Sequence, residues 1–502
     1  MVGGLYPHIF SMMKFEEAMI MKKAMFVLLV SAFCVAGCSD SSNGTAPPAP
    51  VTTTDIVTVG TISGFGSVIS NGIEFNTDSV AVTMDGQPAI LADLRIGMTV
   101  SIRGSINDVN GVATASAINF SDDVEGPVGN INMANNSFVV LGRTVLFDEL
   151  TVFDNVTLGS LAAGNVVQVS GQWRSQERIQ ATHVERKANA YVAGMQMEVK
   201  GEISGLDIGL QRFNIGTQAC DYSAAMLELG GASLANGLYV EVSSSSPLLN
   251  GDMVLDRIQA RDRDRDKDQL CDSGCDFDLD GYITSFVSAT EFDVDGSPVT
   301  TTNATVYVNG TVDTLALDVK LAVIGTVDAA GVLVADRIVF HLPSLIEIEA
   351  DVEAVDTTNA TLTVLGAVVT TNESTLFRDH SDAEVREFWL DDLATGDRIE
   401  VRAYLDGNTV IATRVERDNA DDGVTLKAPV EAIDRPSVTL LGVTVTSDDD
   451  TVFQNTAQEI IDVDGFFSLV AIDSLVKAEG SYDGTSILAE KLFLRECDGN
   501  CL

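Results

Sequence analysis

The sequence predicts an all-β protein made of six small barrels in tandem, and three observations lead to this fold class. Its 502 residues are 45% apolar but only 6% aromatic, and Gly, Asn, Asp and Thr interrupt the short apolar runs, as is typical of strands joined by turns. Residues 100–102 and 240–242 alternate apolar and polar side chains, which places one face of each strand in a core and the other in water. One sequence pattern also recurs along the chain, which is typical of a repeat architecture.

The repeat begins with Gly or Ala on an alternating strand and continues with Gly, an apolar residue and Thr-x-Phe or Thr-x-Tyr. Four copies keep one spacing: Gly142, Val145, Thr151 and Phe153; Gly296, Val299, Thr305 and Tyr307; Gly366, Val369, Thr375 and Phe377; and Gly442, Val445, Thr451 and Phe453. A second block reads Leu-x-x-Gly-x-x-Val-x-Val-x-Gly, with Leu94, Gly97, Val100, Ile102 and Gly104 as one copy. Small units without helices bury their edges best by closing, so we expect OB-like or similar Greek-key barrels, arranged as beads on a string.

These repeats divide the chain into domains. We expect an upstream extension with a signal peptide at 1–37, a flexible tether at 38–55, and an acidic junction rich in Asp and Cys at 262–277. The six barrels are then expected at 56–122, 123–190, 197–261, 278–342, 346–419 and 423–502, the last one with a C-terminal Cys pair.

The region before residue 40 reads as a secretory signal peptide. Lys22 and Lys23 precede an apolar run at 24–35, and small residues then lead to Cys38. A transmembrane anchor is the alternative, but it needs about 20 apolar residues. The motif Val-Ala-Gly-Cys resembles the lipobox of bacterial lipoproteins, which implies that Cys38 is lipidated. Since Ser39 follows, the resemblance further implies an outer-membrane lipoprotein that is either periplasmic or surface-exposed.

The charge of the chain limits its partners. With 30 Lys and Arg against 73 Asp and Glu the formal charge is −43, and no basic stretch could release the counterions of DNA or RNA, so nucleic acid is excluded. The acidic excess favours a soluble monomer. The partners we expect are the membrane, through the lipid anchor, and a protein or polysaccharide at the cell surface.

A family resemblance adds to this interpretation. The segment 64–75 reads Gly-Phe-Gly-Ser-Val-Ile-Ser-Asn-Gly-Ile-Glu-Phe, followed by Met-Asp-Gly-Gln-Pro at 84–88 and Leu-Arg-Ile-Gly-Met-Thr-Val at 94–100. These motifs resemble the bacterial family called domain of unknown function 5666, whose members are typically secreted proteins or lipoproteins with tandem copies. The resemblance is good in the first unit, weak in the third, and extends over most of residues 60–492. It implies fold and localisation, and it implies no activity or site residues.

Catalytic residues are not indicated. His183, His341 and His380 lie in three different units, so a hydrolase triad or a zinc site with two His would have to assemble across barrels. There is no Gly-x-Ser-x-Gly elbow around the serines at 243–246, and no Gly-rich phosphate loop with Lys. The sequence therefore predicts that the protein is not an enzyme.

The cysteines of the mature chain form two similar pairs. Cys271 and Cys275, and Cys497 and Cys501, each enclose three residues that include Gly, which predicts two local disulfides in an oxidising compartment. A metal or redox pair is the alternative, but redox motifs usually have two intervening residues and zinc would need further ligands. Cys220 is left over, and we expect it to be buried and free; the alternative is that it pairs with another of the five cysteines of the mature chain.

The acidic junction offers the one candidate cofactor, calcium. Asp276, Asp278 and Asp280 alternate and are followed by Gly281, as in positions 1, 3, 5 and 6 of a calcium loop. The mixture of Asp and Cys, which also includes Asp262, Asp264, Asp266 and Asp268, resembles the calcium-binding repeats of thrombospondin type 3. The alternative is a solvated linker in which Arg257, Arg261, Arg263, Arg265 and Lys267 neutralise these carboxylates.

Taken together, these features predict a non-enzymatic lipoprotein of the cell envelope whose barrels serve binding, adhesion or a scaffold or spacer role. The alternative is a module that binds or processes envelope polysaccharide. Against that alternative, Trp173 and Trp389 are the only tryptophans available for stacking on sugars.

Overall fold

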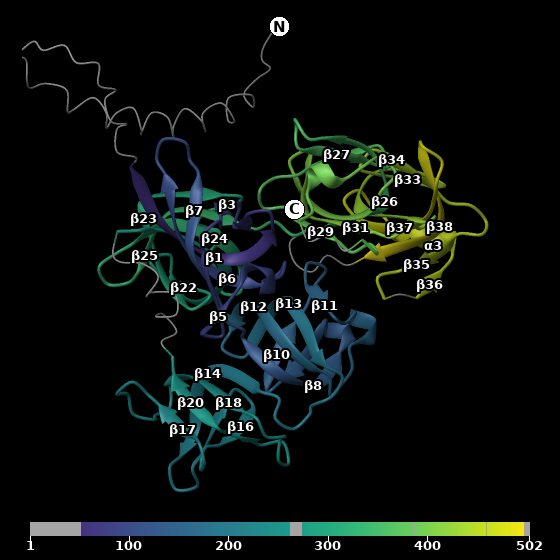
Figure 1. Ribbon diagram of the computed structural model, residues 1–502. Coiled ribbons are helices and arrows are strands. Elements are labelled where there is room, and N and C mark those ends of the chain that lie inside the picture. The colour runs from purple at the N-terminus through teal and green to yellow at the C-terminus, as the bar shows by residue number, and fades with distance from the viewer. Residues whose placement is uncertain (1–51, 262–273, 384, 386, 458, 496–502) are drawn as a thin grey trace, which may run out of the picture. The chain divides into compact units, whose positions relative to one another are not determined.

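The computed structural model describes residues 52–261, 274–383, 385, 387–457 and 459–495. Within these residues the chain is almost entirely β and forms six five-stranded barrels (Figure 1), which confirms the predicted fold class. In barrel 1 the strands join in the ring β1–β2–β3–β7–β6–β1, in which β3 and β7 run parallel. The strands of barrel 1 are β1 (Thr53–Gly64), β2 (Val68–Ser70), β3 (Ile73–Asn76), β4 (Ala81–Met84), β5 (Gln87–Ala89), β6 (Thr99–Asn107) and β7 (Ala113–Phe120).

The same order, first-second-third-fifth-fourth, closes the other barrels, and it is the Greek-key order of an OB-like barrel. Barrel 2 contains β8 (Val124–Asn132), β9 (Ser137–Val140), β10 (Arg143–Leu146), β11 (Val152–Asp154), β12 (Val166–Ser175) and β13 (Arg178–Ala188). Barrel 3 contains β14 (Met197–Asp207), β15 (Arg212–Ile215), β16 (Gln218–Asp221), β17 (Met226–Glu228), β18 (Tyr239–Ser244), β19 (Met253–Val254) and β20 (Arg257–Ala260). In barrel 3, β19 and β20 together take the place of the fifth strand.

The remaining barrels follow the acidic junction. Barrel 4 contains β21 (Asp276–Ser288), β22 (Glu291–Val294), β23 (Ser297–Val308), β24 (Lys320–Val327) and β25 (Leu333–Phe340). Barrel 5 contains β26 (Ile346–Asp356), β27 (Thr361–Val364), β28 (Ala367–Thr370), β29 (Leu376–Asp379), β30 (Arg398–Asp406) and β31 (Thr409–Asp418). Barrel 6 contains β32 (Val424–Asp434), β33 (Ser437–Leu440), β34 (Val443–Thr446), β35 (Val452–Gln454), β36 (Ile460–Ile461), the helix α3 (Val463–Leu469), β37 (Leu475–Tyr482) and β38 (Ser486–Arg495). Among the described residues, no helix combines the length and the apolar character needed to cross a membrane.

The barrels are joined in pairs by continuous sheets, which the sequence did not predict. The first strands make each junction: β8 with β14 unites barrels 2 and 3, and β26 with β32 unites barrels 5 and 6. Barrel 1 pairs with barrel 4 rather than with its neighbour in sequence, because β1 runs parallel to β21 from Ile56 and Asp276 to Val59 and Leu279. The chain therefore leaves barrel 1, forms barrels 2 and 3, and then returns to form barrel 4, which shares one sheet with barrel 1.

The first Gly of the repeat makes room for a turn. A Cβ atom on Gly126 would lie 2.7 Å from Cγ of Leu141, and one on Gly60 would lie 1.8 Å from the Asn71 side chain. Leu141 and Asn71 are the first turn residues between the second and third strands, and both have positive φ, at 43° and 51°. A small residue on the first strand therefore lets the turn residue fold back over the barrel wall.

The Thr of the Thr-x-Phe motif fastens the segment that continues the third strand to the fifth strand; this segment is β11 in barrel 2, the second half of β23 in barrel 4, β29 in barrel 5 and β35 in barrel 6. Its hydroxyl donates to the carbonyl oxygen of an alanine on the fifth strand in all four copies: Thr151 to Ala181 at 2.8 Å, Thr305 to Ala335 at 2.7 Å, Thr375 to Ala412 at 2.8 Å and Thr451 to Ala489 at 2.8 Å. It also accepts the backbone N–H three residues earlier in each copy. The aromatic residue two positions on packs in or against the barrel core, as Phe453 does at 4% exposure. The recurring motif is thus explained by barrel closure.

Candidate functional site: a charged ladder on barrel 5

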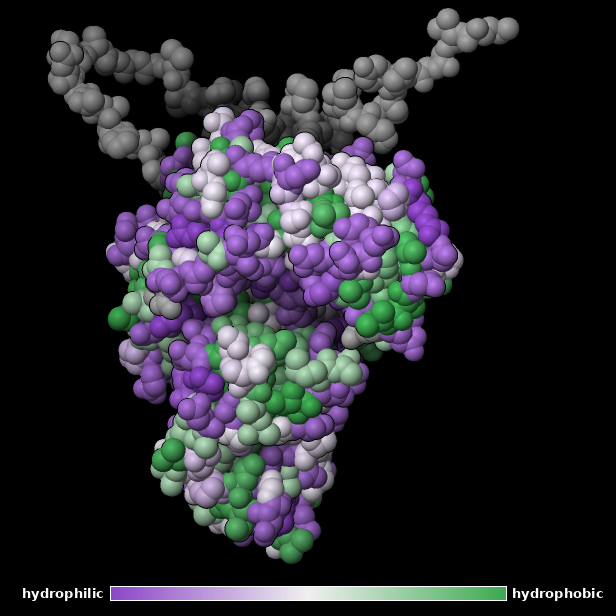
Figure 2. Space-filling model, turned by 90° about the vertical axis from the view of Figure 1, so that its right-hand side faces the viewer, coloured by the Kyte–Doolittle hydropathy of each residue, from purple (hydrophilic) through white to green (hydrophobic). Residues whose placement is uncertain are grey.

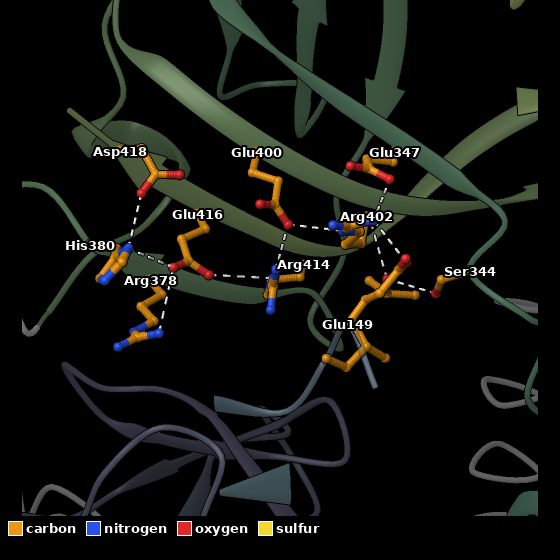
Figure 3. A network of polar contacts seen from close by, with 12 residues as sticks. Glu149, Ser344, Glu347, Arg378, His380, Glu400, Arg402, Arg414, Glu416 and Asp418 are labelled. Carbon is orange, nitrogen blue, oxygen red and sulfur yellow. Dashed lines mark hydrogen bonds and ion pairs between the residues drawn. The ribbon is translucent and has the colours of Figure 1, made fainter. Parts of the chain in front are cut away.

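The outward face of barrel 5 carries a ladder of alternating charges, of which Glu347, Arg402, Arg414 and Glu416 are buried (Figure 3). Period-2 alternation on β26, β30 and β31 places these side chains opposite the core residues Ile348, Val401 and Val415. The ladder consists of Glu347, Glu400, Arg402, Arg414, Glu416, Arg378, His380 and Asp418, with Lys427 and Lys477 from barrel 6 and Glu149 from barrel 2. In a chain with 73 acidic and 30 basic residues, this is a marked concentration of cations.

At one end of the ladder, Glu347 contacts three cations. Its carboxylate lies 2.8 Å from Arg402, 2.9 Å from Lys477 and 3.5 Å from Lys427. Burial by itself would raise the pKa of Glu347, but Arg402 and the two lysines outweigh it and hold the pKa below its usual value. Glu347 therefore stays ionised at the junction between β26 and β32, where it lies directly opposite Lys427.

Glu149 connects barrel 2 to this end of the ladder. Its two oxygens reach Arg402 at 2.7 Å and Lys427 at 3.1 Å. A second contact between the same barrels joins Arg378 to the carbonyl oxygen of Phe153 at 3.4 Å. The Arg402 side chain is only 10% exposed, whereas that of Glu149 is 48% exposed, so this ion pair lies where the ladder meets solvent.

At the other end of the ladder, His380 lies between two carboxylates. Its Nδ1 is 3.0 Å from Oδ1 of Asp418 and 3.3 Å from Oε1 of Glu416. The hydrogen bond with Asp418 and the negative charge of Glu416 raise the pKa of His380 above its usual value. These are the side chains that could hold a metal, and within the described residues they form the one group of three or more His, Cys, Asp or Glu residues whose ligand atoms lie within 4.8 Å of one another.

A second buried charge cluster, at the junction of barrels 2 and 3, is rich in acid. Lys200 lies between Asp122, Glu198 and Glu241, with its Nζ at 3.8, 3.9 and 4.0 Å from their carboxylates. Burial outweighs this cation and raises the pKa of Glu198 to about 7, and burial raises the pKa of Glu125, which lies opposite Glu198 in the sheet, to about 7. The β8–β14 and β26–β32 junctions are equivalent in the fold. At the junction of barrels 5 and 6 the cations around Glu347 balance its charge, whereas at the junction of barrels 2 and 3 Lys200 does not balance the carboxylates around it.

The calcium loop predicted at Asp276 is wrong as a conformation. These residues form β21, in which Phe277 and Leu279 enter the core of barrel 4 and the Asp side chains alternate with them. Asp278 accepts a hydrogen bond from Asn71 at 3.1 Å, and Asp280 contacts His341 at 2.5 Å and accepts from Gln172 at 2.7 Å. A strand inside a sheet cannot wrap around an ion, because backbone hydrogen bonds to β24 and β1 keep its main chain extended.

Several predicted site residues lie outside the described residues. These are the lipidation residue Cys38, the junction residues Asp262, Asp264, Asp266 and Asp268, and the cysteines Cys271, Cys497 and Cys501, so the lipid anchor, the calcium ligands of the junction and both disulfides stay predictions. The prediction for Cys220 is confirmed, since it is free and 1% exposed. Burial also raises the pKa of its thiol to about 12, which makes it unreactive.

The sequence placed the three histidines in separate barrels, and the structure shows what each contacts. His183 is buried 3.7 Å from Asp154, and His341 contacts Asp280. The association of His380 with Glu416 and Asp418 was missed, because the carboxylates lie on a strand more than thirty residues further along. A Glu-x-Asp pair at the end of the fifth strand, with a His directly after β29, is the signal that could have found it.

A family model described as Domain of unknown function (DUF5666) matches residues 125–185, 280–339, 349–416 and 427–492. These segments correspond to barrels 2, 4, 5 and 6. The first unit, where the motifs resemble the family well, and the third lie outside the match, although both barrels have the same ring of strands. No curated protein and no solved structure matches the chain significantly.

Proposed function

The chain belongs to the DUF5666 family, and from that premise we propose that it is a non-enzymatic lipoprotein of the bacterial outer membrane whose barrels form a rigid scaffold with a binding role at the cell envelope. The observation that carries the proposal is the joining of barrels 1 and 4 through β1 and β21, although barrels 2 and 3 lie between them in the sequence. Sheet hydrogen bonds across a junction resist bending, whereas a linker between separate barrels would not.

Contacts between barrels that do not share a sheet support the rigid scaffold. Arg174 of barrel 2 contacts Asp318 of barrel 4 through both carboxylate oxygens, at 2.5 and 2.7 Å. The backbone N–H of Thr99 in barrel 1 donates to the hydroxyl of Ser170 in barrel 2 at 2.8 Å. Trp389 of barrel 5 lies over Gly64 of barrel 1, where a Cβ atom would come within 1.8 Å of the indole ring. Bidentate and close-packed contacts of this kind fix an orientation.

A binding role is supported by apolar loops on barrel 3. Ile208 and Leu210, between the first two strands, are 74% and 69% exposed, and Leu249, between the fourth and fifth strands, is 62% exposed. An ion pair between Arg212 and Asp252, at 2.9 Å, joins the two loops. Figure 2 shows apolar residues on the lower part of the visible face, while hydrophilic residues dominate above. OB barrels bind ligands with these same two loops.

The polysaccharide alternative receives less support, because both tryptophans take part in internal contacts. The indole N–H of Trp173 donates to Asp123 at 2.8 Å, and Trp389 packs against Phe377 at 6.0 Å between ring centroids. A saccharide site of the stacking type needs exposed aromatic faces.

The anchoring part of the proposal is tested by Cys38→Ser in the native host. We expect the wild-type chain to incorporate labelled palmitate and to sediment with the outer membrane, and the variant to lose both properties, because membrane attachment depends on the acyl chains. The matched control is Cys34→Ser, which changes a cysteine inside the signal peptide and should alter neither property. Equal labelling of wild type and Cys38→Ser would refute the anchor.

The scaffold part is tested by the distance between barrels 2 and 5. Spin labels at the exposed positions Ser160 and Thr358, introduced as Ser160→Cys and Thr358→Cys, should give one narrow distance distribution by pulsed electron resonance. Barrels joined only by linkers would give a broad distribution, and that result would contradict a rigid scaffold. Adding Glu149→Gln and Arg378→Gln, which removes contacts between these barrels, should broaden the distribution.

A further inference from the structure

We propose that His380, Glu416 and Asp418 form a binding site for a borderline divalent transition-metal ion of the zinc class. The proposal concerns barrel 5 alone and does not depend on the scaffold function. It begins with strand register: β29 runs parallel to β31 with Asp379 opposite Arg417, and the N–H of His380 donates to the carbonyl oxygen of Arg417 at 2.8 Å. This register brings the imidazole to Asp418, and Glu416 lies on the same face of β31 because the strand period is two.

The distances fit such an ion. Tetrahedral zinc with ligand bonds of about 2.0 Å has its ligand atoms about 3.3 Å apart. The separations from Nδ1 of His380 are 3.0 Å to Asp418 and 3.3 Å to Glu416, and all three ligand atoms lie within 4.8 Å of one another. Rotation of the partly exposed Asp418 side chain can close the remaining gap.

The surroundings combine a fixed ligand with accessible ones. The Glu416 side chain is 8% exposed, and its other oxygen forms an ion pair with Nε of Arg414 at 3.4 Å. The side chains of His380 and Asp418 are 53% and 31% exposed, so an ion can reach them from solvent. Three protein ligands on an open surface leave a fourth position for water, as in zinc sites that are not purely structural.

Neighbouring cations do not block this site. Arg378 lies 3.5 Å from Oε1 of Glu416, a long contact, and its guanidinium also donates to the carbonyl oxygen of Phe153. Arg414 keeps a shorter contact with Glu400 at 2.5 Å, so it remains neutralised when Glu416 binds an ion. Both arginines can therefore retain a partner after the ion enters.

The other repeats show that the fold does not need these three residues. The position that Glu416 occupies opposite β29 in barrel 5 is occupied by Val339 opposite β23 in barrel 4 and by Phe493 opposite β35 in barrel 6, and all three barrels close in the same way. In barrel 2 that position is Glu185, but Lys187 stands where Asp418 would be, and it contacts Glu185 at 3.0 Å. A fold requirement would place similar residues in each barrel, so the constellation is specific to barrel 5.

The ligand types select the class of ion. One imidazole nitrogen with two carboxylate oxygens suits Zn²⁺ and similar first-row ions, whereas Ca²⁺ prefers six to eight oxygens. The test is a titration of the full chain, purified in mild non-ionic detergent with its cysteines oxidised, with ZnCl₂ against a chromophoric chelator. Excess Mg²⁺ in the buffer suppresses weak binding to other carboxylates.

We expect one zinc equivalent in the wild-type chain that His380→Gln and Asp418→Asn each weaken by at least about tenfold, since even outer-shell losses cost about 10–100-fold. His341→Gln is the matched control, because His341 is also partly exposed, at 43%, and contacts the single carboxylate of Asp280. Circular dichroism and melting curves should show that all variants remain folded. The proposal would be overturned by the absence of a zinc equivalent that depends on His380, by an equal loss in His341→Gln, or by displacement of the zinc by millimolar Ca²⁺.

Discussion

Lys200→Met should lower the free energy of unfolding of barrels 2 and 3 by about 3–5 kcal/mol at pH 8, because it leaves the buried carboxylates of Asp122 and Glu198 without their cation, whereas Glu241 keeps its ion pairs with Arg257 and Arg261. The Lys200 side chain is 8% exposed, and those of Asp122, Glu198 and Glu241 are 4%, 7% and 3% exposed. Lys200 also donates to the Ser121 hydroxyl at 2.6 Å and to the carbonyl oxygen of Asp122. Methionine fills a similar volume but offers neither charge nor donors.

The loss should depend on pH in a defined direction. The folded-state pKa of Glu198 is raised to about 7 and that of Asp123 to about 6, both chiefly by burial. A carboxyl group with a raised pKa supports folding below its unfolded pKa and loses that support as pH rises through the folded pKa. Without Lys200 these values rise further, so the variant should be least stable above pH 7 and recover part of the difference at pH 5.

Hydrogen exchange measured by mass spectrometry separates this effect from general unfolding. Peptides from 124–260 should exchange faster in Lys200→Met, and peptides from 346–495 should not change. The control is Lys491→Met, which removes an exposed lysine that contacts Glu479 at 2.9 Å and should alter stability by less than about 1 kcal/mol. Equal protection of residues 124–260 in wild type and Lys200→Met at pH 8 would contradict the central role of this cation.

The fold could be predicted because its determinants are local and repeated. Alternation at 100–102 identifies a strand by itself, and Gly142, Val145, Thr151 and Phe153 recur because each serves one barrel's own turn, core or closure. The pairing of barrels 1 and 4 has no such signature. It uses backbone hydrogen bonds between β1 and β21, and main-chain groups are the same in every residue.

The candidate sites could be predicted from the sequence only in part, because residue spacing alone does not decide the local conformation. Asp276, Asp278 and Asp280 fit the spacing of a calcium loop, but Phe277 and Leu279 between them also give the period-2 pattern of a strand, and the strand is the conformation observed. Burial in the core of barrel 4 decides between the two, because Leu279 is fully buried. The His380 group could not be recognised from spacing, since strand register alone brings its members together.

The second large effect concerns Asp278, whose replacement by Asn should stabilise the protein at alkaline pH. Asp278 is 4% exposed, accepts one hydrogen bond from Asn71 at 3.1 Å, and lies near the charge of Asp280. Burial, opposed only by that hydrogen bond, raises its pKa from 3.8 to about 7. A shift of this size corresponds to about 4 kcal/mol of stability that is lost when the carboxyl ionises.

The sign of the effect follows from the raised pKa. Wild-type stability should fall as pH rises from about 4 to about 7, because only the unfolded chain ionises Asp278 freely over that range. Asp278→Asn introduces an amide that cannot ionise and keeps an oxygen that accepts from Asn71, so this part of the pH dependence should disappear. The variant should match wild type at pH 4 and exceed it by up to about 4 kcal/mol at pH 8.

Two neighbours on the same strand provide controls with different expected signs. Asp276→Asn changes an exposed residue at the start of β21 and should have little effect. Asp280→Asn should destabilise the protein above pH 4, because His341 and Lys320 overcome burial and hold the pKa of Asp280 below its usual value. Denaturant unfolding at pH 4, 6 and 8, with hydrogen exchange of peptides 53–64 and 276–288, distinguishes the three variants. If Asp278→Asn were no more stable than wild type at pH 8, the buried carboxyl would not be the source of the pH dependence, and its hydrogen bond with Asn71 would outweigh the cost of burying the charge.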